Sequence, residues 1–203
     1  GPPLLLIMGT AADHSTWSSQ VAAYNSDFTV ITYDARGTGL SSAPTDPTTY
    51  SMRVLADDAA ALLEIINVDS AHISGLSLGS ATAQEFAISY PHMVRSLQLH
   101  CTWGRSDEWF RRMIDSMEFP VIHDDFESYI RTALLWVASP HFVNERPDDL
   151  AAFERGFILE NPNPPTKCGL LGHFYADRTH NALDRLNTVK VPTLITSGEM
   201  DIQ

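Results

Sequence analysis

The chain has few basic residues, few cysteines and no long apolar run. Its 13 lysines and arginines stand against 25 acidic residues, so the formal net charge is −12 at pH 7. Such a chain has little positive charge with which to neutralise phosphates, which argues against nucleic-acid binding. Two cysteines, Cys101 and Cys168, are too few for a disulfide framework. No apolar stretch reaches the roughly 18 residues of a membrane-spanning helix, so we expect no membrane span.

Patterns that bind phosphates or metals are also missing. The glycine-rich turn Gly37-Thr38-Gly39 lacks the third glycine of a dinucleotide fingerprint, and no phosphate-loop pattern occurs. The eight histidines show no metal-ligand spacing. We therefore expect no cofactor and no metal. The 203 residues, 44% of them hydrophobic, are typical of a soluble globular protein with one sizeable core, for which the cytoplasm is the default expectation.

Apolar runs alternate with amphipathic segments along the first hundred residues. Continuous apolar runs predict strands buried on both faces, at 4–8, 28–33, 71–74 and 94–101. Helical spacing of apolar residues predicts helices between them, at 15–24, 52–66 and 80–90. Strands that alternate with helices imply right-handed crossovers. We therefore predict an α/β fold with a mostly parallel sheet and flanking helices.

The alternation pauses between residues 103 and 186. This stretch shows helical periodicity and no clear strand, and its prolines divide it into short helices. A strand follows at 191–197, with Pro192 near its start, where proline is tolerated. We therefore predict an α/β core formed by residues 1–102 and 187–203, with a helical cap inserted at 103–186.

The segment Gly75-Leu76-Ser77-Leu78-Gly79 carries the most specific functional signal. It follows a predicted strand and precedes a predicted helix, which is the context in which G-x-S-x-G forms a nucleophile elbow. A serine fits such a sharp turn only if the residues two before and two after it lack bulk. The turn lifts the Ser77 hydroxyl clear of the sheet and leaves the Leu78 amide available to an oxyanion.

Four local signatures in this order resemble the α/β-hydrolase fold, most closely its small esterases, enol-lactonases and cofactor-free haloperoxidases. The first is a strand that leads into Met8-Gly9-Thr10, and the second is the D-x-R-G-x-G-x-S turn at 34–41. The third is the elbow at Ser77, and the fourth is the G-E-M-D segment that ends at Asp201. The resemblance covers nearly the whole chain, although the cap matches only in kind.

The resemblance implies roles for individual residues. Ser77 matches the nucleophile, and Asp201 matches the acid that orients the catalytic histidine. The backbone amides of Thr10 and Leu78 match the oxyanion hole. Arg36, in the second signature, matches a structural position and is not expected to be catalytic.

A general base is needed because a serine hydroxyl is a poor nucleophile at neutral pH. In the family the histidine follows the acid, so we expect it beyond Gln203, and we expect the chain to be a fragment that also lacks a first pair of strands. His100 lies near the catalytic edge and is the first alternative. Four histidines of the predicted cap could at most line the substrate cleft: His123, His141, His173 and His180.

The resemblance implies a serine hydrolase that cleaves a small, mostly apolar ester or lactone through an acyl-enzyme. Trp103, Trp136 and His100 are candidate pocket residues. Two alternatives stay open at this point. One is a ligand-binding or signalling protein on the same scaffold with little turnover, and the other is peroxide-dependent chemistry with the same triad. The expected partner is the small-molecule ester or lactone, and the sequence leaves the oligomeric state open.

Overall fold

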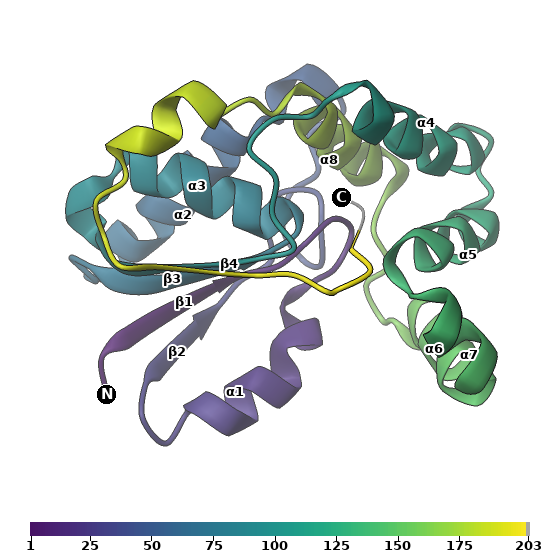
Figure 1. Ribbon diagram of the computed structural model, residues 1–203, viewed down its shortest axis with the longest axis horizontal. Coiled ribbons are helices and arrows are strands. Elements are labelled where there is room, and N and C mark those ends of the chain that lie inside the picture. Colours follow the sequence, from purple (N-terminus) through teal and green to yellow (C-terminus); the bar gives the residue numbers. More distant parts are fainter. Residues whose placement is uncertain (202–203) are drawn as a thin grey trace.

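The computed structural model describes residues 1–201. Its centre is a parallel sheet of five strands in the order β2-β1-β3-β4-β5. The chain runs from the central β1 outward to β2 and then returns past β1 to β3. Its connecting helices lie on both faces of the sheet (Figure 1). The predicted α/β fold with a parallel sheet is confirmed. The strands are β1 (Pro3–Ile7), β2 (Thr29–Thr32), β3 (Ala71–Leu76), β4 (Val94–His100) and β5 (Thr193–Thr196).

The two faces of β1 explain why its sequence is apolar throughout. Leu5 and Ile7 are buried in a core that includes residues of two helices on one face, α2 (Met52–Ile65) and α3 (Leu78–Ser89). Leu4 and Leu6 pack with Trp17 on the opposite face, where α1 (Ser18–Tyr24) lies. Because neighbouring side chains of a strand point to opposite faces, both sets must be apolar.

Helix ends follow local hydrogen-bonding rules. Ser51 caps α2, since its Oγ accepts from the Val54 amide at 3.2 Å. The helix predicted at 15–24 divides into a 3₁₀ turn, η1 (His14–Trp17), and α1, because Asp13 caps η1 through the Ser15 amide. Two further 3₁₀ turns start at prolines: η2 (Pro47–Thr49) and η3 (Pro91–Met93).

Only helices and helical turns occur between Arg105 and Asn181, apart from one isolated bridge that joins these two residues. They lie beyond the end of the sheet at which β4 runs out (Figure 1). None of the described helices is both long and apolar enough to cross a membrane. The helices of this stretch are α4 (Glu108–Ile122), α5 (Phe126–Val137), α6 (Pro140–Glu145), α7 (Pro147–Arg155), η4 (Gly156–Glu160) and α8 (Lys167–Thr179). A 3₁₀ turn, η5 (Leu183–Thr188), follows them and leads to β5.

A second apolar core joins these helices to the sheet layer. It combines Leu55 of α2 and Leu78 of α3 with residues of α4, α5 and α8, among them Ile114, Tyr129 and Phe174. The inner helices α4 and α8 thus share one core with the helix that follows Ser77. The exact division into a core and a cap at residues 103 and 186 stays a prediction.

Candidate active site

Ser77 occupies a strained turn between β3 and α3. Its backbone angles are φ 53° and ψ −122°, a region that L-residues rarely adopt, and such a residue costs roughly 1–3 kcal/mol. The flanking glycines are required by close backbone contacts. A Cβ on Gly75 would lie 2.1 Å from the Gly79 carbonyl oxygen, and a Cβ on Gly79 would lie 2.1 Å from that of Ile7. This geometry agrees with the steric reason for the glycine spacing.

The backbone of this turn is hydrogen-bonded on both sides. The Ser77 amide donates to the His100 carbonyl at 2.9 Å, and the Ser77 carbonyl accepts from the amides of Ser80 and Ala81 at 2.7 and 3.1 Å. The Ser77 side chain, by contrast, makes no hydrogen bond within residues 1–201. A rigid backbone therefore presents a half-buried hydroxyl that is not occupied by any described partner.

The two predicted oxyanion donors border Ser77. Leu78 is the first residue of α3, so its amide has no partner inside the helix. Thr10 lies in the loop after β1, whose Gly9 is so close that a Cβ there would lie 3.2 Å from Ser77 Cβ. Neither the Thr10 nor the Leu78 amide donates to another group in the described part of the chain. No described group therefore occupies either N–H, and their role as oxyanion donors stays a prediction.

The loop that carries Thr10 is held by α8. The Thr10 hydroxyl donates to Asp177 Oδ2 at 2.8 Å, and the Ala11 amide donates to His173 Nδ1 at 3.3 Å. His173 Nε2 lies 2.8 Å from the Arg36 carbonyl. Burial lowers the pKa of His173 to about 4, against the effect of that carbonyl. Burial raises the pKa of Asp177 to about 7, opposed by the Thr10 hydrogen bond and by the charge of Arg178.

Two cap histidines, for which the sequence allowed at most a place in the substrate cleft, are buried in the structure. His173 is fully buried and binds two backbone loops rather than lining a cleft. The structure shows that α8 contributes functional candidates that sequence reasoning missed. The one available signal was the spacing of His173 and Asp177, which lie one helical turn apart in an otherwise mostly apolar stretch of α8.

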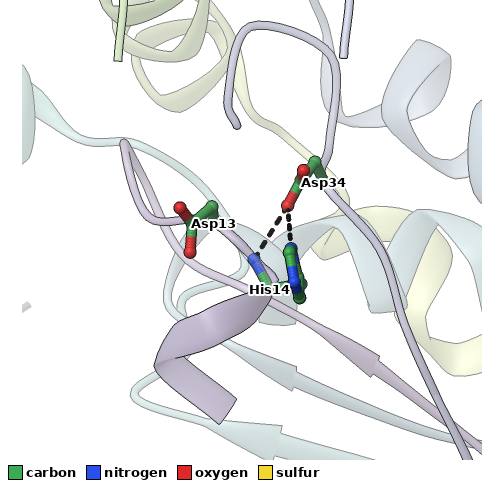
Figure 2. A group of neighbouring side chains, drawn as sticks. All are labelled: Asp13, His14 and Asp34. Carbon is green, nitrogen blue, oxygen red and sulfur yellow. Dashed lines mark hydrogen bonds and ion pairs between the residues drawn. The ribbon is translucent and has the colours of Figure 1, made fainter. Parts of the chain in front are cut away.

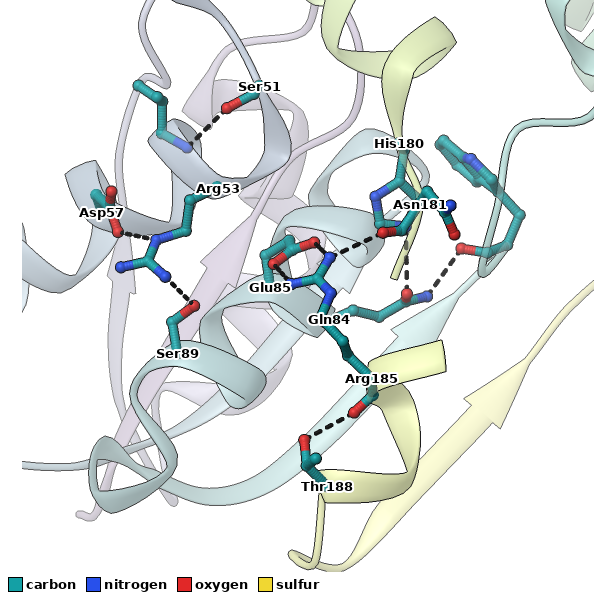
Figure 3. Close-up of polar contacts among 12 residues, drawn as sticks. Ser51, Arg53, Asp57, Gln84, Glu85, Ser89, His180, Asn181, Arg185 and Thr188 are labelled. Atoms are coloured by element: carbon teal, nitrogen blue, oxygen red, sulfur yellow. Dashed lines mark hydrogen bonds and ion pairs between the residues drawn. The ribbon is translucent and has the colours of Figure 1, made fainter. Parts of the chain in front are cut away.

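His180 is the second of these buried histidines. Its Nε2 lies 3.3 Å from Gln84 Oε1, and burial lowers its pKa to about 4 (Figure 3). The Gln84 amide in turn donates to the Trp103 carbonyl at 3.0 Å. Arg185 of η5 forms an ion pair with both oxygens of Glu85 on α3 (Figure 3). These contacts fasten the chain after α8 to the helix that follows Ser77.

Asp201 lies near the end of β4, the strand beside the elbow strand. It contacts Cys101, the first residue after β4, whose φ of 51° is also unusual for a residue other than glycine. Burial raises the pKa of the Cys101 thiol, and a hydrogen bond with Asp201 adds to this effect. The predicted acid and Ser77 thus both follow strands at the same end of the sheet, although their role as a pair stays a prediction.

No histidine side chain in residues 1–201 forms a hydrogen bond with the Ser77 hydroxyl. The side chain of His100 lies across three strands, with Nε2 3.2 Å from Ser74 Oγ and Nδ1 2.6 Å from Thr196 Oγ1. Burial lowers the pKa of His100. Because both of its ring nitrogens are engaged by hydroxyl groups, the described geometry does not favour His100 as the base. The expected histidine beyond Gln203 falls outside the described residues.

The two predicted pocket tryptophans pack between helices. Trp103 is buried against Phe110, with ring centroids 4.5 Å apart, and its indole donates to Ser106 Oγ at 3.0 Å. Trp136 is partly buried; it meets Trp109 edge to face and donates to Ser116 Oγ at 3.0 Å. Neither tryptophan, nor His100, lines the cavity described next. Their assignment to a substrate pocket stays a prediction.

A cavity of about 780 Å³ lies between η1 and the helices α6, α7 and η4, which we call the outer helices. Its wall from α6, α7 and η4 is mostly apolar and includes Phe142, Phe153 and Phe157. Asp13 and Thr16 border it on the side of the Thr10 loop. Ser77 is not among its lining residues, so the cavity adjoins the loop side of the site rather than the nucleophile itself.

One polar cluster beside this cavity was not predicted. Possible ligand atoms of Asp13, His14 and Asp34 all lie within 4.8 Å of one another (Figure 2). Asp34 accepts from the amides of His14 and Leu40 and from His14 Nδ1, at 2.9, 3.0 and 2.7 Å. Burial alone would raise the pKa of Asp34, but these hydrogen bonds lower it overall. Because Asp34 is already satisfied within the turn, the cluster is explained as an ion pair that joins two loops.

The order of elements, the elbow and the loop after β1 together match a known family. The family model of the alpha/beta hydrolase fold matches residues 2–202. The chain belongs to this family. The match extends from the first strand through the helical insertion to the last strand, so the local signatures and the tertiary arrangement agree.

Individual members of the family are similar to nearly the full length of this chain. The proposed carbamate hydrolase RutD of Azorhizobium caulinodans is 29% identical over 201 residues, which are 99% of this chain and 74% of that protein. A hydrolase from Pseudomonas aeruginosa superposes with a TM-score of 0.84 at 27% identity, covering 97% of this chain and 71% of the other. An enol-lactonase from Burkholderia xenovorans gives a TM-score of 0.85 at 24% identity, covering 98% and 73%; at this identity it supports the fold alone.

Proposed function

We propose that the protein is a serine hydrolase that cleaves a small carboxylic ester or lactone. The observation that carries this proposal is the strained Ser77, whose hydroxyl has no described partner and which lies beside two amides that donate to no group within residues 1–201. A turn that costs free energy persists only where surrounding structure holds it in place, and such strain clusters at active sites. Family membership and the relatives named as hydrolases support the same proposal.

The proposed reaction proceeds in two steps. Ser77 Oγ forms a bond to the substrate carbonyl carbon while its proton passes to a histidine outside the described residues, which Asp201 orients. The amides of Thr10 and Leu78 stabilise the oxyanion as charge develops on the carbonyl oxygen. The alcohol leaves with the proton from the histidine. Water then attacks the acyl-enzyme, again losing its proton to the histidine, and releases the acid and free Ser77.

A carbamate is the second candidate substrate class. Several similar proteins carry the name RutD and a proposed carbamate hydrolase activity. A carbamate presents the same electrophilic carbonyl to Ser77 and the same developing oxyanion to the two amides. The site as described therefore fits both classes, and the difference must come from groups that contact the rest of the substrate. The apolar cavity beside η1 is consistent with a small, mostly apolar substrate in either case.

The test is covalent labelling combined with turnover. The protein is expressed from its gene with any flanking coding sequence, and a fluorophosphonate probe is expected to modify Ser77, as read by peptide mass spectrometry. Ser77→Ala is the matched control and must abolish both labelling and hydrolysis. Comparing kcat/KM for para-nitrophenyl acetate and para-nitrophenyl carbamate separates the two substrate classes. A folded protein that takes no label and hydrolyses neither compound would contradict the proposal and favour a ligand-binding role.

A further inference from the structure

The helix α8 carries two buried ionisable side chains that point at one loop. His173 is fully buried and Asp177 is 2% exposed, and they lie one turn apart on the same face of the helix. Their partners, Ala11 and Thr10, are neighbours in the loop after β1, more than 160 residues away in sequence. Burying polar groups of this kind is costly unless they are hydrogen-bonded. Two buried groups of one helix that both bind adjacent residues of the same loop therefore call for an explanation beyond packing.

The loop itself adopts a conformation that needs support. Ala11 has φ 66°, in the left-handed region that alanine disfavours. The Ala12 amide donates to the Gly9 carbonyl at 3.4 Å, so residues 9–12 form a tight turn. The Ala12–Gly9 hydrogen bond closes this turn around Thr10 and Ala11, so the peptide units before and after Thr10 are restricted together. A contact that holds Ala11 in place therefore also limits the orientation of the Thr10 amide.

The hydrogen bonds of His173 determine its tautomer. The Ala11 amide can only donate, so Nδ1 must be the acceptor, and the Arg36 carbonyl can only accept, so Nε2 must carry the proton. The neutral ring satisfies both partners at once, and burial lowers the pKa of His173 to about 4, which keeps the ring neutral. One imidazole thus links the Thr10 loop to the turn that follows β2.

We propose that His173 and Asp177 of α8 are positioning residues that hold the oxyanion-hole loop in its working conformation, through the Ala11 amide and the Thr10 hydroxyl. The proposal rests on the serine-hydrolase function proposed above. Neither side chain touches the substrate in this proposal. Both act through Thr10, whose main-chain N–H is the predicted oxyanion donor, while its side chain is tied back to Asp177 at 2.8 Å.

The surroundings of Asp177 favour this role. Its Oδ1 is buried without a hydrogen-bond partner in residues 1–201, so the bond from Thr10 to Oδ2 is the one side-chain hydrogen bond described for the carboxyl group. The nearby ionisable groups are Tyr129 from α5, together with His173 and Arg178 on α8 itself. Arg178 is engaged by two acids of α4, Asp115 and Glu118. No described cation therefore pairs with Asp177 directly, and Thr10 is its specific partner.

Two substitutions at His173 separate positioning from packing. The side-chain oxygen of asparagine can replace Nδ1 as the acceptor for Ala11, whereas the amide of glutamine can replace Nε2–H as the donor to Arg36. His173→Asn and His173→Gln each lose one of the two hydrogen bonds, so a structural role predicts similar losses of stability. A positioning role predicts a kcat roughly ten- to a hundredfold lower for His173→Gln than for His173→Asn, with KM nearly unchanged.

The measurements use para-nitrophenyl acetate turnover and amide hydrogen exchange at Ala11. We expect faster exchange at Ala11 in His173→Gln only, in step with the loss of kcat. His180→Gln is the matched control, because His180 is also buried with a lowered pKa but contacts Gln84 instead of the loop; it should leave exchange at Ala11 unchanged. Asp177→Asn, which can still accept from Thr10, should keep a higher kcat than Asp177→Leu.

The outcomes are separable. Equal kcat values for the two His173 variants would overturn the inference even if Ser77 proves to be the nucleophile. Faster exchange at Ala11 without a change in kcat would also overturn it, because the loop would then be held without consequence for catalysis. A wild-type protein that shows no Ser77-dependent turnover would overturn the proposed function, and with it this inference. That result is recognised from the wild type alone, before any variant is compared.

Discussion

The inner and outer helices of the insertion are held in different ways. α8 buries Leu170 and Phe174 together with polar residues, whereas α6 and α7 have no fully buried residue. Both regions lie in the stretch that the sequence presents as one helical cap. The comparison shows that α8 belongs to the core that surrounds Ser77, while α6 and α7 form an outer wall over a cavity.

Two glycines allow α8 to pack closely against Gly37, in the turn after β2, and against Tyr50. A Cβ on Gly169 would lie 2.0 Å from the Gly37 carbonyl oxygen, and a Cβ on Gly172 would lie 2.4 Å from the Tyr50 ring. In the outer region, a Cβ on Gly156 would meet nothing within 4 Å. The inner helix is therefore packed against backbone and ring atoms that cannot move aside, and the outer region has free space. Three predictions test this difference, from the largest expected effect to the smallest.

Removing a large side chain should separate the two regions most strongly. Phe174 on α8 is fully buried and packs on Tyr129, so Phe174→Ala should lower the free energy of unfolding by roughly 3–5 kcal/mol. Phe153 on α7 is 54% exposed, and Phe153→Ala should cost less than about 1 kcal/mol. Chemical denaturation of both variants provides the measurement. Equal losses would contradict the division into inner and outer helices.

The buried carboxyl group should make stability depend on pH. Because the pKa of Asp177 is raised to about 7 in the folded protein, the folded state binds more protons than the unfolded state between about pH 4 and 7. Its contribution to stability is thus fully present at low pH and is lost as pH rises through 7. Asp177→Asn removes this dependence, so the stability of the variant relative to wild type should rise by about 4 kcal/mol in total from below pH 4 to above pH 7.

Comparing Asp177→Asn with wild type separates the pH dependence of stability that is due to Asp177 from the part that is due to His173. The lowered pKa of His173 has the opposite effect, since the unfolded state then binds more protons and stability rises with pH between about 4 and 6.5. This contribution is common to wild type and Asp177→Asn and cancels in the difference. Asp148→Asn, at the exposed start of α7, is the control for losing one carboxylate. A difference that does not change with pH would show that Asp177 is ionised in the folded state.

Added methyl groups should have opposite effects in the two regions. Gly169→Ala forces a Cβ against the Gly37 backbone and should lower stability by roughly 2 kcal/mol. Gly156→Ala meets no obstacle and should raise stability by about 0.5–1 kcal/mol, because glycine gives the unfolded chain more freedom. Melting temperatures of the pair provide the readout. A destabilised Gly156→Ala protein would mean that the outer region is packed as tightly as α8.

Much of the fold could be predicted because its signals are local. The apolar runs correctly predicted β1 and β4, and the glycines around Ser77 correctly predicted the turn geometry, since each depends on a few adjacent residues. Element boundaries were predicted less accurately where an N-cap residue lies inside the predicted segment or next to it. Asp13, for example, caps a 3₁₀ turn that precedes α1. The catalytic roles of Ser77 and Asp201 are still predictions that the labelling experiment tests.

The contacts of α8 could not be predicted because they join distant segments. His173 and Asp177 were assigned to a cap on the basis of helical periodicity, and nothing in their own neighbourhood indicates Thr10 or Ala11 as partners. Their pKa shifts arise from burial, which depends on how α8 packs against the rest of the chain. A periodic pattern shows which face of a helix is buried, but not which loop that face meets.

The amino-acid sequence by itself determined the alternation of strands and helices, the elbow at Ser77, the scarcity of basic residues and the lack of long apolar runs. These features depend on side-chain size, periodicity and composition, which act over a few residues. Only the tertiary structure decided that α8 is an inner helix and that its buried His173 and Asp177 meet the Thr10 loop. That result follows from the close approach of Gly169 to Gly37, which is possible only once the chain has folded back over more than 130 residues.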